Sequence, residues 1–106
     1  MTPCVQVTTT LGSRPAADAL ATAVVEAGLA ACAQVSGPVA SVYRWQGAVE
    51  HAEEWYCHLK TTRACQPALE AELRARHPYE VPEIIVIPLE GSPSYLEWIE
   101  HSVRKA

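Results

Sequence analysis

The chain has 106 residues, of which 49% are hydrophobic and 19% are charged, and its formal net charge is −4. This length suits a single domain, residues 1–106, and so much apolar material excludes a disordered chain. An acidic chain without a cluster of basic residues is a poor match for nucleic acid, which attracts proteins largely through its phosphates. No stretch approaches the roughly 20 apolar residues that a membrane span needs.

The start of the chain and its cysteines predict a cytoplasmic protein. The segment Met1-Thr2-Pro3-Cys4 lacks the basic and apolar regions of a secretory signal. No two cysteines have the C-x-x-C spacing of a thioredoxin-like motif or a zinc knuckle. We therefore expect free thiols in a reducing compartment. The cysteines are Cys4, Cys32, Cys57 and Cys65.

The first half of the chain predicts a strand, a helix and a second strand. Residues 4–10 alternate in a β-rich run. Ser13 suits the cap of a helix that Gly28 ends. Residues 29–45 are again strand-like, and Gly37-Pro38 predicts a bulge or bend within them. The apolar stripe of the helix consists of Ala17, Leu20, Val24 and Ala27.

The second half predicts a return strand, a helix, a short strand and a last helix. Polar residues 46–53 suit a hairpin loop, after which residues 54–61 form a strand. A helix follows from about residue 63 to residue 76, where Pro78 stops it. The apolar run 84–87 is typical of a buried strand. The last helix opens at Ser92-Pro93-Ser94, with Ser94 and Glu97 as a capping box.

The order β-α-β-β-α-β-α predicts an α+β fold, a ferredoxin-like split βαβ sandwich with an added C-terminal helix. In this architecture the two crossover helices cover one face of the sheet. The other face is too aromatic to be simply exposed to water, so we expect another subunit to cover it. That face carries Gln6, Thr8, Tyr56, His58 and Lys60.

The residues give little reason to expect an enzyme. Every glycine stands alone, so there is no loop to cradle a phosphate. Asp18 is the only aspartate, and nothing places a serine and a histidine beside it as a triad requires. No known catalytic signature surrounds a cysteine.

Two places offer side chains that bind metals. Cys57 and His58 are neighbours on a predicted strand and therefore point to opposite faces, so they cannot hold one ion. Residues 77–83 read HPYEVPE and present an imidazole, a phenol and two carboxylates between two prolines. A stiff connector with exposed polar groups remains an alternative reading of this segment.

The HPYEVPE segment resembles the hallmark motif of the CutA divalent-cation tolerance family. Further stretches match that family in the same order, and the resemblance runs from about residue 4 to residue 103. They are GLAACA at residues 28–33, SVYRWQG at 41–47, Lys60-Thr61, and YLEWI at 95–99.

The resemblance implies a ferredoxin-like fold assembled as a tight homotrimer, similar in architecture to the PII nitrogen-regulatory proteins. It also implies a role in tolerance of divalent cations, with copper(II) or another divalent cation as a ligand and no essential cofactor. Carried over by residue, the candidate ligands are His77, Cys32 and Glu80. A packing role for Cys32 stays open. The chain has Thr9 and Arg76 where some members offer a cysteine and a further histidine.

Three functions compete on this basis. The first is a trimeric, metal-responsive protein that uses His77. The second is a PII-like ligand-sensing or protein-interaction scaffold. The third, an enzyme using His77 and Glu80 as acid and base, lacks a visible nucleophile and oxyanion donors. The scaffold would have a cleft between subunits lined by Tyr43, Trp45, Lys60 and Tyr79.

Overall fold

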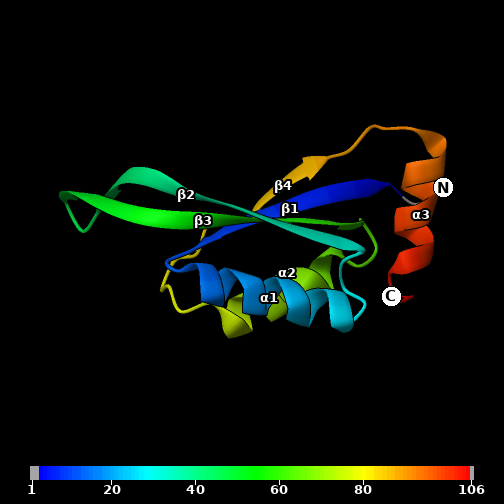
Figure 1. Cartoon of the computed structure of the whole chain (residues 1–106), viewed down its shortest axis with the longest axis horizontal. Helices are drawn as coiled ribbons and strands as arrows, with labels where there is room; N and C mark the ends of the chain where they lie inside the picture. Colours follow the sequence, from blue (N-terminus) through cyan, green and yellow to red (C-terminus); the bar gives the residue numbers. More distant parts are fainter. Residues whose placement is uncertain (1–2, 106) are drawn as a thin grey trace.

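The computed structural model describes residues 3–105, and they form a two-layer α+β fold (Figure 1). The element order confirms the predicted β-α-β-β-α-β pattern with an added helix. The elements are β1 (Cys4–Leu11), α1 (Arg14–Glu26), β2 (Cys32–Trp45), β3 (Ala48–Thr62), α2 (Gln66–Arg76), β4 (Ile85–Pro88) and α3 (Pro93–Ser102).

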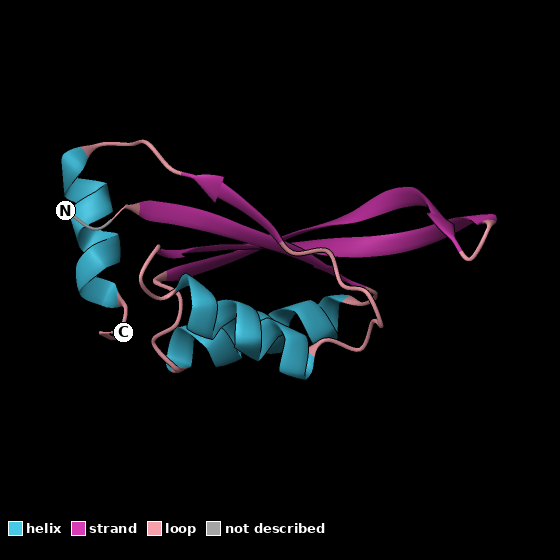
Figure 2. Ribbon diagram, turned by 180° about the vertical axis from the view of Figure 1, so that it is seen from behind, coloured by secondary structure: helices cyan, strands magenta, loops and turns pink. Residues whose placement is uncertain are grey.

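The four strands form one antiparallel sheet in the order β2-β3-β1-β4. Figures 1 and 2 show α1 and α2 side by side against one face of this sheet, as expected, and α3 at the end near the chain termini. None of the helices within residues 3–105 is long and apolar enough to cross a membrane.

The core lies between the sheet and the two covering helices. Alternation along the strands directs Val5, Val7 and Leu59 to the helices, and all three are fully buried. Leu69 and Leu73 on α2 are fully buried as well. Complete burial of one such side chain stabilises the fold by roughly 1.5–3 kcal/mol.

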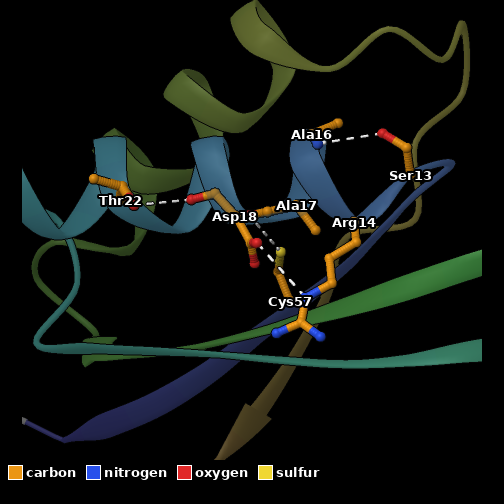
Figure 3. Close-up of polar contacts among 7 residues, drawn as sticks. All are labelled: Ser13, Arg14, Ala16, Ala17, Asp18, Thr22 and Cys57. Carbon is orange, nitrogen blue, oxygen red and sulfur yellow. Dashed lines mark hydrogen bonds and ion pairs between the residues drawn. The ribbon is translucent and has the colours of Figure 1, made fainter.

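Helix α1 is capped at both ends as its residues predict. The Oγ of Ser13 accepts a hydrogen bond from the Ala16 amide at 3.2 Å (Figure 3). The helix ends at the cap residue Ala27, and Gly28 follows with φ of 73°, in the left-handed region that glycine adopts readily. The prediction that Ala27 continues the buried stripe was wrong: it is exposed, because the helix has already ended.

The hairpin between β2 and β3 is much tighter than predicted. Only Gln46 and Gly47 separate the paired residues Trp45 and Ala48. Gln46 has φ of 49° and Gly47 has φ of 81°, positive values at both central positions as a type I′ turn requires. The polar run 48–53, predicted as loop, is therefore strand. Its polarity reflects exposure on both faces.

Before Trp55, residues 48–54 of β3 have no β1 partner and pair with β2 alone. Residues 39–54 thus form a two-stranded arm, which projects from the body in Figure 1 and makes the molecule 45 Å long. The predicted irregularity at Gly37-Pro38 is confirmed, because the register shifts between Ser36 and Val39.

Three boundaries or environments differ from the sequence predictions. Helix α2 begins at Gln66, three residues later than predicted. The cap of α3 is Ser92, whose Oγ accepts from the Tyr95 amide at 3.4 Å, and Ser94 lies inside the helix because Pro93 occupies its first turn. Strand β4 is not buried on both faces: Ile85 and Ile87 are 49% and 47% exposed, since no part of residues 3–105 covers that side.

Candidate functional site

The segment 77–84 connects the helix layer to the edge strand β4. Helix α2 stops at Arg76, and His77 adopts an extended conformation with ψ of 131°, as a residue before proline prefers. The segment then passes the end of β1 before it joins β4 (Figure 1). It therefore carries its polar side chains to the edge between the helix layer and the sheet.

The imidazole of His77 is held by hydrogen bonds at both nitrogens. Its Nε2 lies 2.7 Å from the carbonyl oxygen of Thr10, and its Nδ1 lies 3.1 Å from the backbone nitrogen of Tyr79. A carbonyl only accepts and a backbone amide only donates, so the ring is the neutral tautomer with its proton on Nε2. His77 consequently fixes the start of the segment to β1.

Tyr79 provides the second attachment. Its hydroxyl donates to Oε2 of Glu54 at 3.0 Å, and its ring lies 4.7 Å from the His77 ring. Burial, then the Glu54 hydrogen bond and charge, raises the pKa of Tyr79 to about 12. A Cβ on Gly12 would lie 3.2 Å from this hydroxyl, so Gly12 leaves it room.

The sheet face opposite the helices, here called the open face, carries a network centred on His58. Its Nδ1 lies 3.3 Å from Thr8 Oγ1 and 3.4 Å from Gln6 Nε2, while its Nε2 lies 3.3 Å from Ser36 Oγ. Tyr56 stacks on the same ring, with 5.3 Å between centroids. The face is therefore ordered by its own side chains.

The structure does not bring the three predicted metal ligands together in one chain. Cys32 pairs with Lys60, which in turn pairs with Gln6, whereas His77 contacts Thr10. Four residues of β1 span about 13 Å, and β2 lies two strand spacings from β1, about another 10 Å. Within residues 3–105, no three His, Cys, Asp or Glu side chains form a group that could hold a metal. The expected ligand set thus does not fit one ion in a single chain.

Glu80, the third predicted ligand, lines a surface groove whose lining includes neither His77 nor Cys32. It is exposed and lines a shallow groove of about 400 Å³ between α2 and the segment. The other lining residues are Arg74, Tyr79, Val81, Pro82 and Ile84.

The four predicted cleft residues are also spread along one chain. Tyr43 and Trp45 are on the arm, 45% and 37% exposed, and Tyr79 lies near its base. Lys60 lies six residues farther along β3 than Glu54, about 20 Å away, and donates to Gln34 Oε1 at 2.6 Å. A cleft that uses all four therefore requires a second chain.

Sequence reasoning missed Glu54, which is only 8% exposed and accepts the Tyr79 hydrogen bond. One signal could have found it: Glu54 shares strand parity with Tyr56 and His58, so it belongs to the same face. Glu83 was recognised within the motif, but nothing linked it to β3.

A family model described as "CutA1 divalent ion tolerance protein" matches residues 5–102. This chain belongs to the CutA1 family. It is 40% identical over 94 residues to the divalent-cation tolerance protein CutA of Thermus thermophilus, covering 88% of this chain and 91% of the relative.

Two plant relatives extend the comparison. The crystal structure of CutA1 from Oryza sativa superimposes with a TM-score of 0.94 at 34% identity, covering 99% of this chain and 97% of that one. The chloroplastic CutA protein of Arabidopsis thaliana is 37% identical over 103 residues, covering 96% of this chain but 57% of the relative. The fold expected from the CutA resemblance is thus confirmed.

Proposed function

We propose that this CutA1-family protein acts as a homotrimer in the tolerance of divalent cations, without an enzymatic step. The main support for an oligomer is the apolar surface that a single chain leaves exposed. Ile85 and Ile87 are about half exposed on the open face, and Tyr43 and Trp45 are exposed on the arm. Apolar side chains exposed both on the open face and on the arm are typical of surfaces that a protein partner covers. The number of copies, three, follows from the family resemblance.

His77 is the proposed metal contact, with Glu80 of the same segment and Cys32 as weaker contributors. Both nitrogens of His77 are engaged, so copper(II) gains access only if one of these hydrogen bonds opens. We therefore expect copper binding to be weak and coupled to release of Tyr79. The proposal places the protein in the cytoplasm, and its four free cysteines support a reducing compartment.

The separation of Cys32 from His77 favours a second candidate, the PII-like scaffold. Its ligand would occupy a cleft between subunits lined by Tyr43, Trp45, Lys60 and Tyr79. Its ligand would be a small anion attracted by Lys60. Metal tolerance would then be an indirect consequence of binding that ligand.

Native mass spectrometry of the reduced, chelator-stripped full chain tests the proposal. We expect a trimer, which Ile87→Glu dissociates and the matched control Val25→Glu leaves intact, because Val25 is exposed on α1 away from the sheet. Copper is then added in steps. His77→Ala should lower copper uptake more than His101→Ala, since the His101 side chain is 74% exposed and lies 4.0 Å from Glu97 Oε1 on the same helix.

These measurements test the assembly, the metal contact and the scaffold separately. A wild-type monomer at every concentration would refute the assembly. Equal losses for the two histidine variants would refute the metal contact, and a trimer that takes up no copper yet is stabilised by a small anion would favour the scaffold.

A further inference from the structure

The arm has little support from the rest of the sheet. Within residues 39–54, β2 and β3 pair only with each other, because the β1 partners of β3 begin at Trp55. The β2–β3 register also shifts between Ser36 and Val39, at the base of the arm. A two-stranded ribbon twists readily, and a bulge bends the strand that carries it. The arm can therefore change its direction relative to the body at this junction.

One side-chain hydrogen bond joins the arm to the body. The Tyr79 hydroxyl donates to Oε2 of Glu54 at 3.0 Å. Within residues 3–105, no other side-chain hydrogen bond links residues 39–54 to the rest of the chain. A hydrogen bond to a carboxylate is charge-assisted and stronger than one between neutral groups. This contact is called the latch below.

The body end of the latch is held in place. The Tyr79 backbone amide donates to Nδ1 of His77 at 3.1 Å, and the two rings lie 4.7 Å apart. His77 Nε2 in turn donates to the Thr10 carbonyl at 2.7 Å, so both residues are attached to β1. The phenol therefore reaches the arm from a fixed position.

The arm end of the latch is a carboxylate that needs this partner. Glu54 is only 8% exposed, and the Tyr79 hydroxyl is the one hydrogen-bond partner of its carboxylate among the described residues. Burying a carboxylate without a partner is costly, because it loses its hydration. Without the hydroxyl, Glu54 regains water only if the base of the arm moves away from the segment 77–84.

The direction of the arm decides where its exposed rings point. Val39 pairs with Glu54, and alternation along β2 puts Tyr43 and Trp45 on the same face of the arm as Glu54. Glu54 also alternates with His58 along β3, so this face of the arm continues the open face. A partner that covers both surfaces therefore meets them at an angle that is set at the junction.

We propose that the latch fixes the direction of the arm and thereby presents Tyr43 and Trp45 to a second copy of this chain. A second copy is the expected partner because the arm face continues the surface of the half-exposed Ile85 and Ile87, which the proposed trimer covers. The fixed direction of the arm requires one chain only, whereas its effect on assembly rests on the proposed function. The segment 77–84 then has a structural role that is independent of metal binding.

Residual dipolar couplings of the backbone amides measure the direction of the arm in the ¹⁵N-labelled full chain. Ile87→Glu provides a background in which no partner holds the arm, and the wild type serves if it is itself a monomer. In this background the couplings of residues 39–54 should fit the alignment of the body. Tyr79→Phe should make them smaller, so that they no longer fit, while unchanged body couplings show that the fold is intact.

Tyr95→Phe is the matched control for the couplings. Tyr95 is 40% exposed and Tyr79 is 37% exposed, but the Tyr95 hydroxyl has no hydrogen-bond partner among the described residues. The arm couplings should therefore stay unchanged in Tyr95→Phe. Arm couplings of Tyr79→Phe that still fit the body would overturn the latch, whatever the oligomeric state.

Sedimentation equilibrium measures the effect on assembly. Tyr79→Phe should raise the dissociation constant of the trimer several-fold relative to wild type, because a loosened arm must be ordered again on association. A loosened arm with an unchanged dissociation constant would overturn the role of the latch in assembly. A wild-type monomer would overturn that role together with the proposed trimer, while the couplings of the same monomer would still decide whether the latch holds the arm.

Discussion

Two buried threonines differ in whether the side-chain hydroxyl has a hydrogen-bond partner. Thr9 and Thr61 are both fully buried on neighbouring strands. The Thr61 hydroxyl donates to the carbonyl of Leu29 at 2.7 Å, whereas the Thr9 hydroxyl has no partner among the described residues. A buried hydroxyl without a partner loses its hydration and gains nothing in return.

Replacing each threonine with valine should therefore have opposite effects. Thr9→Val keeps the side-chain shape and removes an unpaired hydroxyl, so the free energy of unfolding should rise by about 1 kcal/mol. Thr61→Val leaves the Leu29 carbonyl unpaired and should lower it by about 1–3 kcal/mol. Urea unfolding at one protein concentration measures both, and a destabilised Thr9→Val would contradict the account.

His77 shows where prediction from sequence reaches its limit at the residue scale. The motif identified the imidazole, and Pro78 correctly predicted that the helix stops before His77. Its partner is a backbone carbonyl 67 positions earlier, at Thr10, and no local spacing reveals such a contact. The same holds for Tyr79 and Glu54, whose bond depends on the path of the segment around the edge of the sheet.

Among the elements, the junction between the body and the arm depends on Gly37. Its φ is 147°, and an added Cβ would lie 2.8 Å from Trp55 Cδ1 and 3.0 Å from the Glu54 carbonyl oxygen. Gly47 in the hairpin turn also has a positive φ, 81°, but nothing lies within 4 Å of its Cβ position. The two glycines thus share backbone strain but differ in available space.

Gly37→Ala should therefore destabilise the chain more than Gly47→Ala. Positive φ costs each alanine about 1–2 kcal/mol, and Gly37→Ala adds a clash with backbone and ring that Gly47→Ala avoids. Thermal unfolding of both variants, compared with wild type, measures the difference. Equal losses would mean that the junction relaxes without cost.

The elements themselves were largely predictable, and the exceptions have physical causes. Period-two alternation identified the faces of β3 because Cys57 and Leu59 pack on the helices. The same rule failed on residues 48–53, since an arm exposed on both sides needs no apolar face. The apolar run of β4 predicts a buried strand, but Ile85 and Ile87 are half exposed because no described residue covers that side.

For the whole molecule, the cysteines distinguish the core from the open face. Cys57 donates to the Ala17 carbonyl at 3.5 Å, and burial, then the charge of Asp18, raises its pKa to about 11 (Figure 3). It therefore stays a thiol at neutral pH and reacts slowly. Cys32 is half-buried, and its register with Lys60 places it on the open face.

Brief alkylation followed by peptide mapping should report the assembly through Cys32. In the wild-type trimer that we propose, Cys32 should react slowly, and in dissociated Ile87→Glu it should react several-fold faster, because the partner no longer covers it. Cys57 should remain unmodified in both proteins. Equal Cys32 rates would place this residue outside the interface.

The position of β1 in the sheet has a consequence for synthesis. This first strand lies between β3 and β4, and Val5 pairs with both Thr61 and Pro88. Strand β1 is synthesised before both of its partners, so its two edges can be paired only after β4 has left the ribosome. The β2–β3 hairpin, joined by two residues, can form while translation continues, whereas β1 waits. The sheet is therefore completed only after Pro88 has emerged, and until then the nascent chain keeps an unpaired strand edge available to chaperones.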